Sequence, residues 1–364
     1  MNVPKIAREG LRSVGKLFSP KRAQEDTLEA LWPDRGGSCI RNREKSWLEA
    51  QVDLSIIIPC YNNAPYLRGC LDSVLGQKTG YSFEAVVIDD GSTDETPEIL
   101  NAYAANPRVR LLRQENQGHS GARNAGLSIC RGKYLLFHDS DDTLLPGSIQ
   151  ALLDCAFQND ADIAIGGYVC KDAAGNVTPG KTYSAGPVTD RQRIPGMTCG
   201  KAFRRRLWAN LQFPLGYWYE DSVISQILLP MARRIYAIDA PVFAYLLNPL
   251  GVSAASQGRP KSLESLYVTR RLLKEREFFG LRYDRDAYTH FLHMVLLTYH
   301  RTRLLPKDVP YAVFLCQRQL QSTYFPGVSA PESYASLAES LEKGRFRNYL
   351  WLCETLWLKN RMGG

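Results

Sequence analysis

The sequence lacks any long hydrophobic run. No stretch of apolar residues approaches the roughly 20 that a membrane-spanning helix needs. The N-terminal residues also lack a hydrophobic signal core followed by a cleavage site. The sequence therefore predicts a protein with neither a membrane span nor a secretory signal.

Closely spaced cysteine pairs are absent too. None of the nine cysteines, an odd number, forms a CxxC pair. Several fall inside predicted helices and strands, among them Cys70, Cys130 and Cys170. This pattern is typical of reduced thiols, so we expect a cytoplasmic protein.

Basic residues are in excess, but they are not regularly interleaved with aromatic residues. The formal net charge of +8 allows nucleic acid, an anionic membrane surface or a phosphate-bearing substrate as a partner. Without the interleaving of a single-strand binding groove, we expect no nucleic-acid partner. The basic N-terminus fits a helix in peripheral contact with the inner face of the membrane. A merely disordered or packed leader is an equally good interpretation.

Two familiar nucleotide-binding signatures are missing. Gly118, Gly121 and Gly126 do not have the spacing of a dinucleotide-binding fingerprint. No lysine follows them as it would in a phosphate-binding P-loop. Both types of nucleotide site are therefore excluded.

Residues 53–169 alternate between strand-like and helix-like patterns. This alternation is typical of an α/β fold with a doubly wound, mostly parallel sheet flanked by helices. We expect a basic leader over residues 1–52, this α/β domain over 53–255, and a mainly helical region over 256–364. The predicted strands are 54–59, 83–90, 108–113, 133–138, 161–169 and 235–245, and the predicted helices are 64–76, 92–105, 120–130, 146–159 and 219–231.

Acidic residues lie at the ends of two apolar runs in the predicted strands. Asp89 and Asp90 end one apolar run, and Asp139, Asp141 and Asp142 end another. Ligands of open parallel sheets bind where the carboxyl ends of the strands emerge. Carboxylates there suit Mn2+ or Mg2+ and a sugar-bearing nucleotide. The alternative is a solvated turn whose aspartates cap the helix beginning near residue 146.

The first acidic pair predicts nucleoside recognition. A carboxylate at a strand end can accept a hydrogen bond from a uracil N–H group or a ribose hydroxyl, and we assign this role to Asp90. Helix capping is the alternative use of such acids, and Ser92 and Asp94 are placed to serve it.

Four motifs in order resemble the family 2 glycosyltransferases of the GT-A fold, over about residues 53–255. They are Pro59-Cys60-Tyr61-Asn62, Asp89-Asp90-Gly91-Ser92-Thr93-Asp94, the pair Asn116-Gln117-Gly118 and Ala122-Arg123-Asn124-Ala125-Gly126, and Asp139-Ser140-Asp141-Asp142. The resemblance implies a nucleotide-diphospho-sugar donor, a divalent metal and inversion at the anomeric carbon.

The resemblance also implies roles for individual residues. The residues expected to bind the nucleotide are Pro59, Tyr61, Asn62, Asp89, Asp90, Arg123 and Asp141. Asp141 would face the ribose, while Asp142, with Asp139, would hold the metal. A bracing role for Arg123 at the strand ends is an equally good interpretation.

An inverting transfer needs a general base for the acceptor hydroxyl. Family members place a Glu-Asp pair where this sequence has Glu220 and Asp221, and the resemblance makes Asp221 the base. Trp218 and Tyr219 would stack on the sugars of the acceptor. The alternative is a capped helix start, since acids favour a first turn.

Two departures from the family pattern narrow the prediction. The Gln-x-x-Arg-Trp motif of processive members is absent, which favours addition of a single sugar. Residues 245–256 match a late family loop through Gly251-Val252-Ser253, but Leu246-Leu247-Asn248 replaces its arginine. The residues that could supply the charge instead are Lys201, Arg204, Arg205 and Arg206.

These observations predict a glycosyltransferase that uses a nucleotide-sugar donor, a UDP-sugar by preference. The acceptor would be a glycan or a lipid-linked molecule, as in surface-polysaccharide assembly. The alternative is a protein of the same fold that binds a nucleotide sugar, or acts as a scaffold, without turnover.

Overall fold

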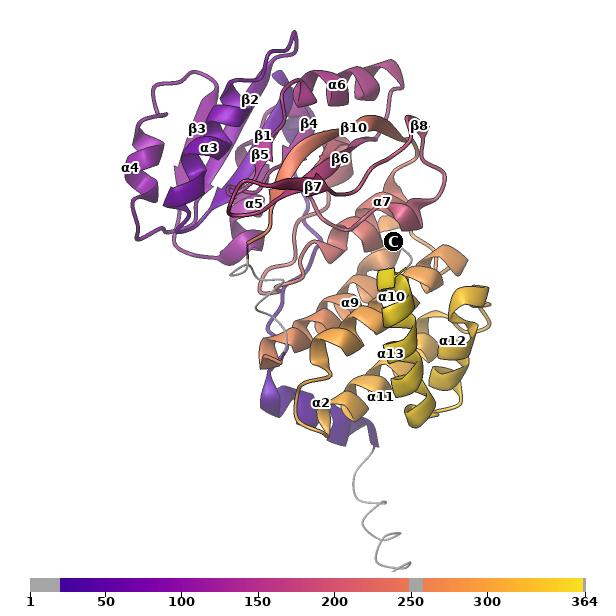
Figure 1. The fold of residues 1–364 in the computed structure, drawn as a ribbon. Coiled ribbons are helices and arrows are strands. Elements are labelled where there is room, and N and C mark those ends of the chain that lie inside the picture. Colours follow the sequence, from indigo (N-terminus) through magenta and orange to yellow (C-terminus); the bar gives the residue numbers. More distant parts are fainter. Residues whose placement is uncertain (1–19, 249–257, 363–364) are drawn as a thin grey trace, which may run out of the picture. The chain divides into compact units, whose positions relative to one another are not determined.

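A mixed β-sheet runs through one of two units in the computed structural model (Figure 1). The structure describes residues 20–248 and 258–362. Among these, residues 36–248 and 271–282 form the unit that contains the sheet, and residues 20–35, 258–270 and 283–362 form a helical unit. The predicted basic N-terminal helix lies outside the described residues.

Four parallel strands form the first half of the sheet. In spatial order they are β3 (Val109–Arg113), β2 (Phe83–Asp89), β1 (Val52–Cys60) and β4 (Gly132–Phe137). β1 and β2 are buried along almost their whole length. Such continuous apolar runs are expected for parallel strands that are covered on both faces.

The second half of the sheet contains antiparallel pairs. β9 (Lys201–Arg204) runs antiparallel to both β4 and β6 (Ile163–Lys171), and β10 (Ile235–Leu246) runs parallel to β6. Three short strands pair antiparallel at this end: β5 (Thr143–Leu144) and β8 (Gly186–Pro187) with β10, and β7 (Val177–Pro179) with β6. The predicted α/β fold class is confirmed, with a sheet that is mixed beyond β4.

Helices cover both faces of the sheet. α3 (Ala64–Leu75) and α6 (Ser148–Gln158) share a hydrophobic core with Ile56 and Ile58 of β1. α5 (Gly118–Ile129) packs on the other face, where Gly126 meets Ile57. A Cβ atom at residue 126 would lie 2.4 Å from Ile57 Cγ2, so this glycine allows close packing. Successive strand side chains point to opposite faces, which explains the division.

Two predicted helices are shorter in the structure. α4 (Thr96–Asn101) ends before residue 105, and only turns follow it. Residues 219–231 begin with turns and continue as a π-helical segment, Ile224–Leu228, followed by the short α7 (Leu229–Met231). Pro230 lacks the N–H donor that a regular helix needs there.

The helical unit confirms the predicted helical C-terminal region. Its helices are α2 (Pro20–Leu31), α9 (Glu264–Glu275, whose last residues belong to the sheet-containing unit), α10 (Arg285–Thr302), α11 (Val309–Tyr324), α12 (Ala335–Glu342) and α13 (Phe346–Met362). Short 3-10 turns occupy Lys45–Leu48, Arg191–Arg193, Arg205–Trp208, Pro260–Leu263, Arg276–Phe279 and Glu332–Tyr334. Within the described ranges, no helix has the length and apolar character needed to cross a membrane.

Candidate active site

The loops after β1, β2 and β4 meet at one edge of the sheet. These strands are parallel neighbours, so their carboxyl ends lie together. The Asn62 backbone N–H donates to Ser92 Oγ at 3.0 Å, which joins the first two loops. Asn63 Nδ2 donates to Ser140 Oγ at 2.7 Å, which joins the first loop to the third. The predicted motifs therefore occupy one connected site.

Asp89 and Asp90 are both buried but have different partners. Asp89 Oδ1 accepts from the Ser92 backbone N–H at 2.9 Å, and Arg113 Nε lies 3.4 Å from its other oxygen. Asp90 Oδ1 accepts from Gln114 Nε2 at 2.7 Å and from the Gln117 N–H at 2.9 Å. The turn that contains the Asn-Gln-Gly motif thus orients Asp90.

The β1 loop presents one aromatic side chain to solvent. Tyr61 is 49% exposed, whereas Pro59 is buried within β1. Asn62 has a positive φ of 48°, and its Oδ1 accepts from the Thr93 N–H at 2.7 Å. Tyr61 and Asn62 are therefore the exposed residues of the three, and Tyr61 is the one that offers an aromatic ring to a ligand.

Asp142 has an unusual environment for a carboxylate. It is 1% exposed, and its Oδ1 accepts from the Leu246 N–H at 2.8 Å. No described residue donates to its Oδ2, which is also buried. Burial, reinforced by the charge of Asp139, raises the pKa of Asp142 to about 9. Burial also raises the pKa of the neighbouring, half-buried Asp141.

Arg123 connects the acidic loop, residues 139–142, with the segment that contains the predicted general base, residues 218–221. Its guanidinium donates to Asp139 Oδ1 at 2.8 Å and forms a close ion pair with Glu220. Burial opposes ionisation of Asp139, but the charge of Arg123 outweighs it and holds the pKa below its usual range. Burial raises the pKa of Glu220. One buried arginine from α5 therefore bridges two segments that are distant in sequence.

The four residues of the segment that contains the predicted general base, 218–221, differ in exposure. Tyr219 and Glu220 are buried, whereas Trp218 and Asp221 are half-buried. Asp221 lies in the turn that leads into the π-helical segment. Of the two aromatic residues expected to stack on acceptor sugars, Trp218 is the more accessible.

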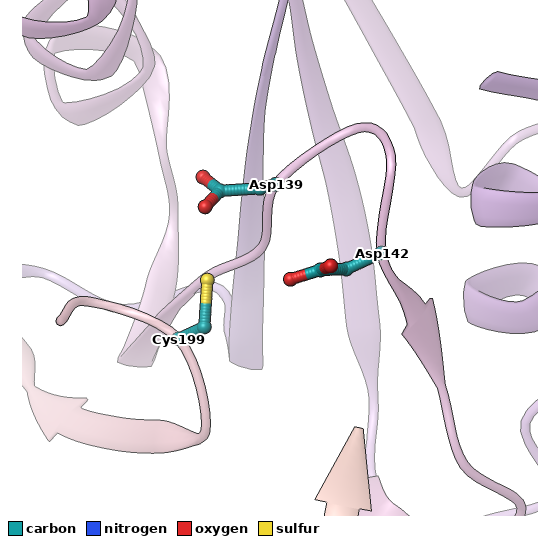
Figure 2. Close-up of side chains that lie close together, drawn as sticks. All are labelled: Asp139, Asp142 and Cys199. Carbon is teal, nitrogen blue, oxygen red and sulfur yellow. The ribbon is translucent and has the colours of Figure 1, made fainter. Parts of the chain in front are cut away.

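Asp139, Asp142 and Cys199 form a cluster with the composition of a metal site. One ligand atom from each lies within 4.8 Å of the others, and Figure 2 shows the three side chains converging. The unpartnered Oδ2 of Asp142 is the kind of hard oxygen that Mg2+ and Mn2+ accept. The residues present therefore fit a divalent cation.

Sequence reasoning missed two neighbours of this cluster. Cys199 was counted only among the reduced thiols, and neither its spacing nor its flanking residues marked it. His119 lies in the first turn of α5 and interacts electrostatically with Asp139, Asp141 and Glu220. Its position after the Asn-Gln-Gly motif was the one available signal.

The candidates for the missing family arginine lie at two different edges. Arg204 and Arg206 contact Asp162, and Arg205 donates to Cys130 O, all near the start of β4. Lys201 is buried near the carboxyl end of β4, and burial lowers its pKa to about 8. Of these cations, Lys201 alone lies at the edge that carries the acidic loop.

The segment that replaces the arginine contacts the acidic loop. Leu246 donates its N–H to Asp142, and the Asn248 side chain hydrogen-bonds Asp141. The Gly251-Val252-Ser253 match lies outside the described residues.

Comparisons with known proteins agree with this architecture. Residues 55–209 match the family model described as Glycosyl transferase family 2. The chain is 33% identical over 232 residues to the uncharacterized glycosyltransferase YibD of Escherichia coli K12, which covers 58% of this chain and 66% of YibD. It is 30% identical over 213 residues to glycosyltransferase GlyA of Streptococcus pneumoniae, which covers 54% of this chain and 30% of GlyA.

A solved structure shares the fold over most of the chain. Staphylococcus aureus TarS 1–349, crystallised with UDP-GlcNAc, has a TM-score of 0.67 at 19% identity and covers 85% of this chain and 92% of that one. Of the two curated relatives, YibD and GlyA, the chain spans 66% and 30% of the length, which is less than two thirds of either.

Proposed function

The chain belongs to glycosyl transferase family 2, and we propose that it transfers one sugar from a UDP-sugar, with inversion and with Mn2+ or Mg2+ as cofactor. The proposed acceptor is a hydroxyl group of a glycan or a lipid-linked molecule in surface-polysaccharide assembly. We place the protein in the cytoplasm or at the inner face of the membrane.

The buried Oδ2 of Asp142 carries this proposal. A carboxylate oxygen without a donor is costly in a protein interior unless a ligand completes its coordination. Asp142, with Asp139, would hold the cation beside the strand ends. A bound divalent cation neutralises the charge that develops on a departing nucleoside diphosphate.

The donor nucleotide is proposed to lie over the β1 and β2 loops. Asp90 would accept a hydrogen bond from the base and Asp141 one from the ribose, with the exposed ring of Tyr61 beside them. Complexes of TarS with UDP-GlcNAc and with UDP support the choice of a uridine nucleotide.

Asp221 is proposed as the general base. It would take the proton of the acceptor hydroxyl as that oxygen bonds to the anomeric carbon and the bond to the diphosphate breaks. Attack opposite the leaving group inverts the configuration. Arg123 would hold the two halves of the site together, because it pairs with both Asp139 and Glu220.

The test separates donor binding from turnover. Asp221→Asn should lower the transfer rate by about a hundredfold or more, the contribution of a general base. UDP should still raise the melting temperature of the variant when Mn2+ is present, and EDTA should abolish that shift.

A matched control is Asp239→Asn, which changes an exposed aspartate of β10 in the same unit. This variant should keep both activity and binding. If Asp221→Asn retains nearly the full rate, Asp221 is not the base. If the unmodified protein binds UDP-sugars but neither transfers nor hydrolyses them, it is a nucleotide-sugar-binding protein instead.

A further inference from the structure

Cys199 contributes a sulfur atom to the acidic cluster. Its Sγ lies within 4.8 Å of carboxylate oxygens of both Asp139 and Asp142. Figure 2 shows the two aspartates on the loop after β4 and the cysteine on a separate segment, which leads into β9. The thiol is 3% exposed, so it meets the carboxylates in the protein interior rather than in solvent.

The backbone around Cys199 fixes the thiol in this place. Gly200 has a φ of +73°, and a Cβ atom there would lie 2.8 Å from Phe243 Cε1, so the turn requires glycine. The Lys201 ammonium donates to the carbonyls of Met197 at 2.7 Å and Cys199 at 3.4 Å. A buried cation therefore secures the segment from within.

We propose that Cys199 is a third protein ligand of the divalent metal and makes the site favour thiophilic ions over Mg2+. This inference rests on the proposed metal-dependent function. The unpartnered Oδ2 of Asp142 is the independent sign of a ligand at this point. Thiolate ligands favour softer transition metals, whereas Mg2+ requires oxygen.

Without a metal, burial and the charges of Asp139 and Asp142 hold the pKa of the Cys199 thiol well above its usual range, so the thiolate would form only as the metal binds. Arg123 already neutralises Asp139 through a 2.8 Å ion pair. Ionised Asp142 and a Cys199 thiolate would together balance a divalent cation, and the protons of both groups would leave to solvent when the metal binds.

Two other buried cysteines provide matched controls. Cys70 Sγ lies 3.7 Å from the backbone carbonyl of Asp139, and Cys130 Sγ lies 3.4 Å from the carbonyl of Leu127. Both thiols are as buried as that of Cys199, but neither belongs to the group of converging ligand atoms. A general effect of removing a buried thiol would therefore appear in all three variants.

The experiment titrates Co2+ and Cd2+ into the full chain in the presence of UDP. Co2+ should produce the near-ultraviolet charge-transfer absorption of a cobalt–thiolate bond. The band should vanish in Cys199→Ser and persist in Cys70→Ser and Cys130→Ser. By calorimetry, Cys199→Ser should reduce the preference for Cd2+ over Mg2+ by about tenfold or more, the lower end of the cost of disturbing a metal site.

Other results would overturn either the proposed Cys199 ligand or the metal dependence itself. If calorimetry shows that Co2+ binds but the unmodified protein has no thiolate band, Cys199 is not a ligand and the proposed function stands. A band that persists in Cys199→Ser has the same meaning. If neither Co2+ nor Mn2+ binds with UDP, the metal dependence of the proposed function fails as well. The spectrum of the unmodified protein decides the question even if Cys199→Ser does not fold.

Discussion

Two buried aspartates lie at opposite edges of the sheet and differ in what their oxygens contact. Asp162, just before β6, is paired with Arg206 and accepts from the backbone N–H groups of Arg233 at 2.7 Å and Arg234 at 3.2 Å. Asp142, beyond the end of β4, has one donor to Oδ1 and none among the described residues to Oδ2. The first carboxylate is satisfied by the chain, whereas the second is left for a ligand.

The pKa values of the two carboxyl groups move in opposite directions. Burial opposes the charge of Asp162, but the hydrogen bonds from Arg233, Arg206 and Arg234 outweigh it, so its pKa is lowered. Burial raises the pKa of Asp142 to about 9, and Asp139 adds to the effect. An internally paired acid thus stabilises the fold at neutral pH, while an unpaired one costs stability and is a candidate functional group.

Asp142→Asn should lower the transfer rate more than any other variant considered below. Loss of the proposed metal ligand should remove several kcal/mol of transition-state stabilisation, which is about a thousandfold in rate. The free energy of unfolding at pH 7 should stay the same or rise, because the variant removes a carboxyl group whose charge the interior disfavours. Initial rates with Mn2+ and a urea titration measure the two quantities.

A large loss of stability in Asp142→Asn would contradict the distinction between the two aspartates. It would mean that Asp142 stabilises the fold as Asp162 does and that its second oxygen finds a partner in solution. Retention of the full rate would remove Asp142 from the metal site.

The next effect comes from Asp162→Asn, the counterpart at the other edge. It should lower the free energy of unfolding by about 3 kcal/mol, the upper end for hydrogen bonds to a charged group. Binding of UDP and Mn2+ by the folded protein should not change. Urea titrations and calorimetry at pH 7 measure these quantities.

The pH dependence sharpens the same test. The contribution of Asp162 is fully present above the pKa of an unfolded aspartate, about 3.9. It is lost as the pH falls through the lower pKa of the folded state. The stabilities of the unmodified protein and Asp162→Asn should therefore converge in acid. A difference that stays constant between neutral and acidic pH would show that the ion pair contributes nothing.

The difference between the two edges also shows what the sequence could predict. The acids of the candidate site were found because each follows a continuous apolar strand, and parallel strands bring such ends together. Their partners come from segments far away in sequence: Leu246 lies 104 residues after Asp142, and Glu220 lies 97 residues after Arg123. No local pattern encodes such contacts.

The direction of β9 explains why the sequence could not show which cation lies near the metal site. Lys201 and Arg204 are three residues apart and looked equivalent as cations in the sequence. β9 runs antiparallel to β4, so Lys201 lies near the metal-site edge while Arg204 lies near Asp162. Cys199 lies in the site for the same reason, because it precedes β9, which begins beside the carboxyl end of β4.

Gly126→Ala should produce a smaller effect that reaches both stability and the site. The added Cβ would lie 2.4 Å from Ile57 Cγ2 and push α5 away from β1. Overpacking of this kind costs about 2 kcal/mol. Arg123 lies one turn earlier on the same helix, so UDP binding with Mn2+ should weaken as well. Normal UDP affinity in a destabilised variant would show that the Arg123 contacts do not depend on close packing of α5.

The smallest effect is expected from Gly69→Ala on α3, a helix on the opposite face of the sheet. Gly69 lies midway along α3 and is exposed to solvent. No atom lies within 4 Å of the position that a Cβ atom would take there. Alanine should therefore stabilise the protein by about 0.5–1 kcal/mol through helix propensity alone. Urea titration should show this gain while the transfer rate and UDP affinity stay unchanged. A gain in stability accompanied by weaker UDP binding would mean that the site depends on flexibility of α3. The pairing of Asp142 and Asp162 would then not be enough to tell residues that stabilise the fold from residues that serve the site.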